Sequence, residues 1–247
     1  MAISPPRPDM PSSATRGTVS PQPLPATPGK RRRPDQLTGG RHGLTAAEVA
    51  ASQRARIVRA MTAAVGEHGY HGTRVADVVW RAGVSRKTFY ELFNGKDDCF
   101  AATYDHWLGW LLETTFDAFD TQARWVDSLR AALTALLGAL AREPQAARLC
   151  FAEAMAAGGE AAARRDEGMQ RLAALFDGPS VPAGPLGETL RAGRVGELCE
   201  TLRREIAADR TTRLPDLAPE LMYAMTLSFL GVEAAQRELD RGRAATP

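Results

Sequence analysis

Apolar residues recur at helical spacing from residue 46 to near the C-terminus, and this pattern predicts the elements of the chain. The first helix is expected to begin near Thr45, with Thr45 or a neighbouring residue as its cap, and to end near Gly69, where Gly66 and Gly69 interrupt the pattern. Its buried stripe consists of Ile57, Met61, Ala64 and Val65.

Two short helices are expected next, separated by a glycine turn. Thr73 is the predicted N-cap of the helix over 74–82, and Ser85 is the predicted N-cap of the helix over 86–93. Gly83 supplies the turn between them, because a left-handed backbone costs glycine little. The inward residues are Val75, Val78, Val79, Ala82, Phe89 and Phe93. Three helices in this layout form a helix-turn-helix head, in which the last helix enters the major groove of DNA.

The remainder of the chain shows only helical periodicity, broken at Pro144, at Pro215 and in the glycine- and proline-rich loop over 178–187. No segment alternates as a strand does. The fold class predicted is all-α, with a helix-turn-helix DNA-binding domain over 46–98 and a larger helical ligand-binding and dimerisation bundle over 99–242. The helices expected in and beside this bundle span 97–119, 125–142, 144–156, 159–176, 187–209 and 217–240.

Residues 1–45 have a different composition. They hold nine of the sixteen prolines and few large apolar residues, so we expect a disordered tail. Within it, Lys30 to Arg33 form a basic run. Such a run is either a solvated charge cluster or an arm that reaches DNA.

Charge is divided unevenly along the chain although the net charge is only +2. Residues 1–100 contain 15 basic and 8 acidic side chains, whereas the remainder contains 16 and 21. A basic front half is typical of a protein that meets a polyanion.

Other classes of function find little support in the sequence. No apolar run is long enough to span a bilayer and the N-terminus lacks a secretory pattern, so a cytoplasmic protein without a membrane partner is expected. Cys99, Cys150 and Cys199 show no metal spacing; buried free thiols are the favoured interpretation and a thiol sensor is the alternative. No catalytic grouping is present. We therefore expect no metal, no cofactor and no enzymatic activity.

The outward side of the third predicted helix carries the candidate chemistry. With Phe89 and Phe93 in the core, the exposed residues are Arg86, Lys87, Thr88 and Tyr90. Arginine and lysine bind guanine or phosphate, and hydroxyls donate to phosphate. Free N–H groups after Thr73 and Ser85, and the cation of Lys96, would add to the attraction for phosphate.

At this point the head resembles the DNA-binding domain of tetracycline-repressor-like (TetR) regulators, over residues 50–104. The resemblance is carried by GTRVADVVWRAGVSRKTFYELFNGKDDCF (72–100) and by RIVRAMTAAVGEHGY (56–70) before it. It implies a homodimeric transcriptional regulator, most often a repressor that leaves its inverted-repeat operator when an unidentified small-molecule inducer binds. The residues alone leave repression and activation both open.

The resemblance also assigns DNA contacts within the head. It places phosphate contacts at Thr88, Tyr90, Lys96 and Thr73, and base reading at Arg86 and Lys87. Lys87 stands where many members have glycine, and Glu91 stands where many have a phosphate-binding polar residue. Glu91 therefore points away from DNA, accepts from a cytosine amine, or pairs with Lys87 at i, i+4.

Two further sets of residues are predicted in the larger domain. Apolar side chains can line a ligand pocket or simply fill the core; they are Trp107, Trp110, Phe116, Phe151, Met155 and Phe176. Two helical stripes can form a dimer interface or, again, the core; they are Leu198, Leu202, Ile206, Leu221, Met225 and Phe229. A competing hypothesis is a helical small-molecule carrier or enzyme with a degenerate head.

Overall fold

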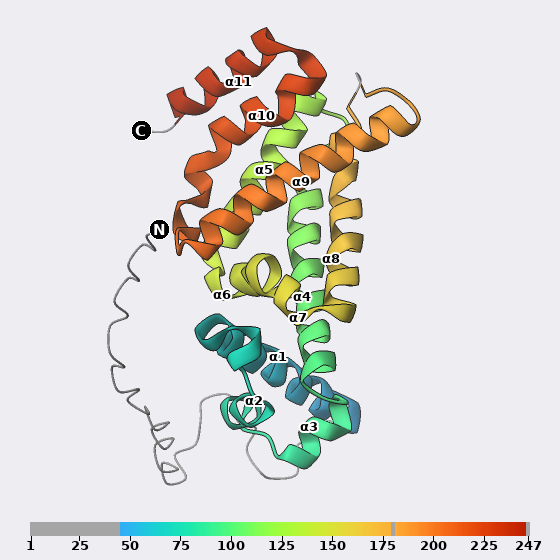
Figure 1. The fold of residues 1–247 in the computed structure, drawn as a ribbon, viewed down its shortest axis with the longest axis vertical. Coiled ribbons are helices and arrows are strands. Elements are labelled where there is room, and N and C mark those ends of the chain that lie inside the picture. Colours follow the sequence, from blue (N-terminus) through green and yellow to red (C-terminus); the bar gives the residue numbers. More distant parts are fainter. Residues whose placement is uncertain (1–44, 179–180, 246–247) are drawn as a thin grey trace, which may run out of the picture. The chain divides into compact units, whose positions relative to one another are not determined.

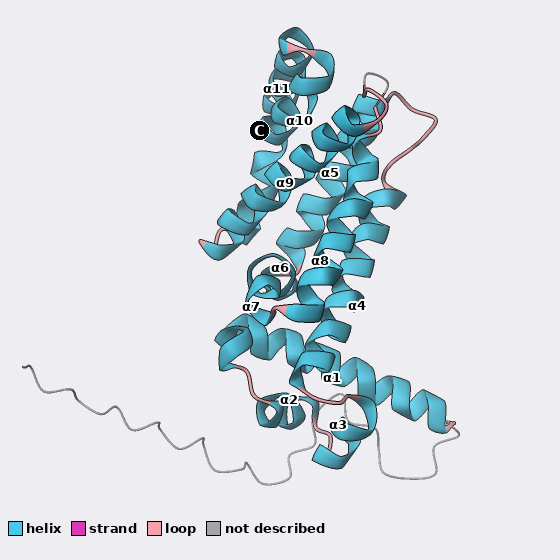
Figure 2. Cartoon of the chain, turned by 45° about the vertical axis from the view of Figure 1, so that its right-hand side comes forward, coloured by secondary structure: helices cyan, strands magenta, loops and turns pink. Residues whose placement is uncertain are grey.

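The computed structural model describes residues 45–178 and 181–245. The chain divides into a unit over Met1–Gln36 and a unit over Leu37–Pro247, and all described residues belong to the second. The predicted disordered tail and the basic run from Lys30 to Arg33 lie outside the described residues. The described part contains helices joined by loops and no strand, which confirms the all-α prediction (Figure 2).

Three helices form the head: α1 (Ala46–Gly72), α2 (Val75–Ala82) and α3 (Arg86–Leu92) (Figure 1). A capping box starts α1, in which the side chains of Thr45 and Glu48 each accept from the other's backbone N–H. Near its end α1 is kinked at Gly69, whose φ of 69° is in the left-handed region. The chain leaves α1 there and turns into α2, as the glycine positions predicted.

The next helix, α4 (Lys96–Asp117), begins in the head and continues into the larger domain, where it packs against α5 (Trp125–Arg142) and α8 (Gly159–Leu172) (Figure 1). Between α5 and α8 the chain forms α6 (Pro144–Arg148), a π-helical turn η1 (Leu149–Glu153) and α7 (Ala154–Ala157). The 3₁₀ turn η2 (Ala173–Phe176) follows α8, so the single helix expected over 159–176 ends four residues early.

The C-terminal part consists of α9 (Pro185–Ala207), the 3₁₀ segment η3 (Thr211–Leu217), α10 (Ala218–Leu230) and α11 (Val232–Ala245). The single helix expected over 217–240 is wrong. Gly231 has φ 79°, a left-handed conformation that interrupts the α-helix, and the chain folds back there so that α11 packs along α10 (Figure 1).

One continuous apolar core joins head and bundle. It extends from Ile57 and Phe89 in the head, through Phe100 and Tyr104 on α4, to Leu202 on α9. Among the described residues no helix combines the length and apolar character needed to cross a membrane.

Candidate nucleic-acid interface and ligand cavity

Local hydrogen bonds fix the start of α3. Gly83 adopts φ 63° and ends α2, and Ser85 Oγ accepts from the Thr88 N–H at 3.0 Å. The hydroxyls of Ser85 and Thr88 also lie 2.9 Å apart, within hydrogen-bonding distance. The predicted capping role of Ser85 is therefore confirmed, and its hydroxyl is engaged at the helix start.

The inner face of α3 is held by aromatic packing. Phe89 and Phe93 are buried, with ring centroids 5.7 Å apart, as predicted. The Arg54 guanidinium of α1 lies 4.5 Å from the Phe93 ring centroid and donates to the Leu92 carbonyl at 3.4 Å. These contacts orient α3 on α1 and leave its opposite side to solvent.

That opposite side carries the predicted DNA-facing residues. Arg86 and Lys87 are exposed, Tyr90 is 57% exposed and Thr88 is partly exposed. Lys87 Nζ lies 3.8 Å from Glu91 Oε1, so of the three alternatives for Glu91 the structure shows the i, i+4 pair. Both partners are exposed and such a pair contributes little to stability. It does reduce the positive charge that Lys87 presents.

Lys96 already has partners within the protein. Its Nζ donates to the Tyr70 carbonyl at 3.1 Å and lies 4.1 Å from the centroid of the Tyr70 ring. Tyr70 in turn donates its hydroxyl to Asp97 Oδ1 at 2.5 Å, and burial together with this bond raises the pKa of Tyr70 to about 12. Lys96 therefore joins the start of α4 to the end of α1.

Thr73 is placed differently from the prediction. It ends α1 rather than capping α2, is only 2% exposed, and donates its hydroxyl to the Gly69 carbonyl at 2.8 Å. The N-cap of α2 is Arg74, whose N–H donates to Asp77 Oδ2 at 3.0 Å. The kink at Gly69 causes the difference, because it turns Thr73 inward. This side chain is not presented to a phosphate.

A direct bond links the head to the larger domain. The Tyr70 N–H donates to Glu153 Oε2 at 2.8 Å, and Arg148 Nε lies 3.4 Å from the other carboxylate oxygen of Glu153. Gly69 lies against the same carboxylate, since a Cβ there would be 3.2 Å from Oε2. No sequence motif marks Glu153, because 83 residues separate it from Tyr70.

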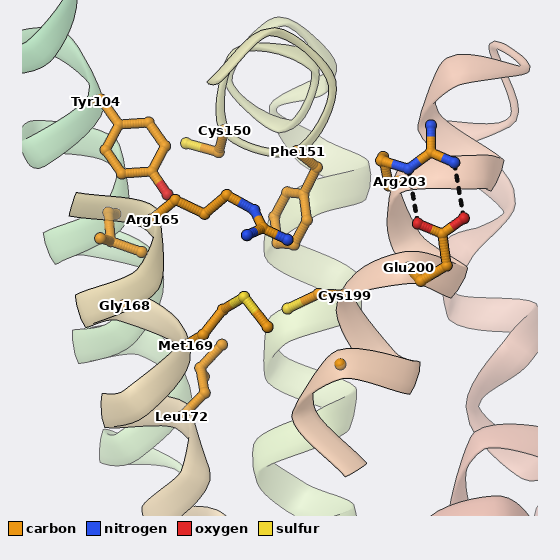
Figure 3. Close-up of a pocket in the computed structure, with 12 residues that line it drawn as sticks. Tyr104, Cys150, Phe151, Arg165, Gly168, Met169, Leu172, Cys199, Glu200 and Arg203 are labelled. Atoms are coloured by element: carbon orange, nitrogen blue, oxygen red, sulfur yellow. Dashed lines mark hydrogen bonds and ion pairs between the residues drawn. The ribbon is translucent and has the colours of Figure 1, made fainter. Parts of the chain in front are cut away.

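The larger domain contains a cavity of 80 Å³ between α4, η1, α8 and α9 (Figure 3). Side chains from all four elements line it, and Arg165 on α8 faces it. Of the six predicted pocket residues only Phe151 is among them. The lining residues are Tyr104, Leu108, Cys150, Phe151, Arg165, Gly168, Met169, Leu172, Gly196, Cys199, Glu200 and Arg203.

The other five predicted pocket residues lie outside this cavity, and Trp107 lines a separate hollow between α1 and α4. Trp107 donates its indole N–H to Thr62 Oγ1 at 2.8 Å and packs edge-on against Trp110. Met155 is 58% exposed, and Phe176 is buried and stacks with Phe229. Phe116 is partly buried against the core. Helical spacing identified these residues as apolar positions but did not distinguish a cavity wall from the core around it.

All three cysteines are buried, as the favoured interpretation expected. Burial raises the pKa of Cys199 to about 11 and that of Cys99 to about 12, and it raises the pKa of Cys150 as well. Each is therefore a neutral thiol at physiological pH, with low reactivity. Cys150 and Cys199 form part of the cavity wall.

The predicted dimer stripes are part of the core of a single chain. The six side chains are at most 7% exposed, and the alternative interpretation as core is correct for all of them; they are Leu198, Leu202, Ile206, Leu221, Met225 and Phe229. An amphipathic pattern shows that a face is buried without showing which chain covers it.

Comparison with known proteins agrees with this geometry. Residues 57–103 match the family described as bacterial regulatory proteins, tetR family. The head of this chain is therefore similar to the DNA-binding region of that family. No curated protein matches it. Members of that family are DNA-binding transcriptional regulators, which supports the prediction of DNA binding and transcription regulation for this chain.

Solved structures share the fold beyond the head. FadR from Bacillus halodurans, a fatty acid degradation regulator, is 19% identical with a TM-score of 0.62, covering 70% of this chain and 94% of that one. FadR from Bacillus subtilis, solved with stearoyl-CoA, is 19% identical with a TM-score of 0.61, covering 72% and 98%. A regulator from Pseudomonas aeruginosa PAO1 is 22% identical with a TM-score of 0.59, covering 74% and 92%. The similarity of fold therefore extends beyond the head into the larger domain.

Proposed function

We propose that this protein is a ligand-responsive repressor that binds an inverted-repeat operator as a homodimer. The observation that carries the proposal is the outer face of α3, where Arg86, Lys87 and Tyr90 are exposed while Phe89 and Phe93 anchor the helix. Arginine and lysine on such a helix read guanine in the major groove or bind phosphate. The hydroxyls of Thr88 and Tyr90 can donate hydrogen bonds to the phosphates of the DNA backbone.

The operator can be tested with DNA from the region upstream of the gene. Fluorescence anisotropy between 50 and 200 mM salt should show an affinity that falls steeply with salt. Arg86→Ala and Tyr90→Ala should each weaken binding, the arginine by about ten- to a hundredfold if it contacts a base. Arg171→Ala, an exposed change on α8, is the matched control. Salt-independent binding, or equal binding by Arg86→Ala, would contradict the proposal.

Homodimerisation follows from operator symmetry, since two heads must span about 34–36 Å of duplex. The six stripe residues are buried within one chain, so the contact would use exposed side chains of the C-terminal helices. Light scattering on the purified chain, alone and with operator, tests this. A monomer that binds a single half-site would contradict the dimer.

Repression itself is tested in cells. Deleting the gene should raise transcription from the promoter that the protein binds. A fall in transcription would instead identify an activator. A carrier or enzyme with a degenerate head remains the rival: it predicts that Arg86→Ala with Tyr90→Ala leaves the protein's cellular effect unchanged.

The response to a ligand has a structural route in the contacts of η1. This turn places Cys150 and Phe151 at the cavity and Glu153 on the Tyr70 N–H. A ligand that displaces Phe151 would move Glu153 and with it the end of α1, from which α2 and α3 continue. Such π turns occur often at functional positions in helices.

A further inference from the structure

Three charged side chains line the cavity, and two of them pair with each other. Glu200 and Arg203 lie on α9, and the guanidinium donates to both carboxylate oxygens at 2.7 Å, so this pair neutralises itself. Arg165 is the third charged side chain in the lining. Its ion pair is with Asp166 at 3.1 Å, and the Asp166 carboxylate is 68% exposed and does not line the cavity. Asp166 thus pairs with Arg165 through Nη1 from outside the cavity, and Arg165 is the one cation in the lining that is not paired with another lining residue.

The remaining wall is neutral and mostly apolar. Burial raises the pKa of the Tyr104 hydroxyl, so it stays protonated, and the thiols of Cys150 and Cys199 stay protonated for the same reason. Apolar side chains complete the wall; they are Leu108, Phe151, Met169 and Leu172. A wall of this kind suits a ligand with an apolar body and a single polar group.

The position of Arg165 fits that polar group. In Figure 3 its side chain extends from α8 with the guanidinium beside Phe151, while Met169 and Leu172 follow along the same helix. A guanidinium is a planar donor that matches a carboxylate with two parallel hydrogen bonds. A carboxylate at Arg165 would leave the body of the ligand against the apolar side chains.

The size of the cavity limits that body. At 80 Å³ the space is well below the roughly 300–1,000 Å³ of typical ligand pockets. On the α9 side there is open space, because a Cβ on Gly196 would meet no heavy atom within 4 Å. A short chain or a single ring is therefore favoured over a long or bulky molecule.

We propose that this cavity is a binding site for a small organic carboxylate, held by Arg165 at its charged end and by the apolar wall along its body. The inference deepens the proposed function, on which it rests for the role of this ligand as the inducer. Binding beside Phe151 would act on η1, which also holds the end of α1 through Glu153.

Calorimetry on the purified full-length protein tests the site. The probes are hexanoate, octanoate and benzoate, with methyl octanoate and octanol as uncharged counterparts. We expect at least one acid to bind, and its uncharged counterpart to bind at least tenfold more weakly. Arg165→Gln should weaken binding of the acid at least tenfold, whereas Arg171→Gln, an exposed change on the same helix, should leave it unchanged.

A second pair of variants tests the cavity without removing the charge. Gly196→Leu adds a side chain to the wall and should abolish binding of the acid. Gly193→Leu adds the same side chain one turn earlier on α9, at an exposed glycine outside the cavity, and should not. Circular dichroism checks that all four proteins fold.

Several results would overturn the inference: no acid binds, methyl octanoate binds as well as octanoate, or Arg165→Gln binds like the wild type. Tight binding of octanoyl-CoA that does not depend on Arg165 would also overturn it.

DNA binding by the unliganded protein is measured separately. If DNA binding is present and the acids fail, this inference falls and the proposed regulator stands; if the acids bind and DNA does not, the proposed function falls.

Discussion

The Tyr70 N–H donates to the Glu153 carboxylate across the boundary between the head and the larger domain. Tyr70 also holds Lys96 through its carbonyl and Asp97 through its hydroxyl, so one residue joins the ends of α1 and η1 to the start of α4. The position of the DNA-binding helices is thereby tied to the element that faces the cavity.

Glu153→Ala should destabilise the protein by about 1–3 kcal/mol, because it leaves the Tyr70 N–H without its acceptor and removes one of the two ion pairs of Arg148. Urea denaturation measures the change, with Glu167→Ala on the exposed side of α8 as the control. In the DNA assay, Glu153→Ala should also reduce the effect of a bound ligand on affinity. An unchanged ligand effect would show that Glu153 is not on the route between the two sites.

Glu91→Gln should strengthen binding to DNA several-fold and make it more sensitive to salt, since it removes a negative charge and releases Lys87 from its pair. Because both side chains are exposed, stability should change by less than about 0.5 kcal/mol. Anisotropy titrations at several salt concentrations measure both effects. Weaker binding would instead indicate that Glu91 accepts from a base.

Thr73→Val should reduce stability by about 1 kcal/mol, because the buried hydroxyl loses its bond to the Gly69 carbonyl. The salt dependence of DNA binding should stay as in the wild type, because Thr73 does not face solvent. Lys87→Gln is the contrasting variant, with a salt slope reduced by about 1. A similar reduction in Thr73→Val would restore Thr73 as a phosphate contact.

Gly83→Ala should destabilise the head by about 1–2 kcal/mol, since φ 63° is a left-handed conformation that a Cβ disfavours. Gly109→Ala is the opposite case: Gly109 lies inside α4, where an added Cβ meets no heavy atom within 4 Å, and it should stabilise by about 0.5–1 kcal/mol. Thermal unfolding of the two variants should shift in opposite directions.

The stability contributed by Tyr70 should depend on pH. Its pKa is raised from 10.0 to about 12 in the folded protein, so the folded state holds this proton more tightly than the unfolded state. The contribution is fully present below pH 10 and is lost as pH rises toward 12. Tyr70→Phe should therefore be less stable than the wild type at pH 8, and the gap should narrow by pH 11. A constant gap would contradict the raised pKa.

The head could be predicted from sequence because its signals are local. Ser85, Gly83 and the spacing of Phe89 and Phe93 each act within one turn of helix, and each behaves as expected. The prediction that Thr73 caps α2 is wrong because the end of α1 and the start of α2 are adjacent in sequence. With the kink at Gly69, Thr73 ends α1. Gly231 lies inside an apolar run, and the sequence pattern therefore did not predict the break that it makes between α10 and α11.

The larger domain was less predictable because its function depends on contacts between distant segments. Phe151 and Phe176 are equivalent in an apolar pattern, yet one lines the cavity and the other packs against Phe229. No sequence pattern marks Arg165. Its proposed role as a ligand contact depends on its place in the cavity wall, where the other two charged side chains, Glu200 and Arg203, pair with each other. The contact that Glu153 makes with the head could be recognised only once the structure placed its carboxylate at the Tyr70 N–H.

The π turn η1 has a consequence for how this regulator could diverge. A π turn holds one residue more than an α turn, so deleting a single residue between 149 and 153 would restore regular α-helix and change the spacing between the residues of this turn, while the flanking turns keep their orientation. The side chains at the cavity and the carboxylate at Tyr70 could no longer both keep their partners. The loss of one codon would thus separate the proposed ligand site from the head while the helices on both sides are retained.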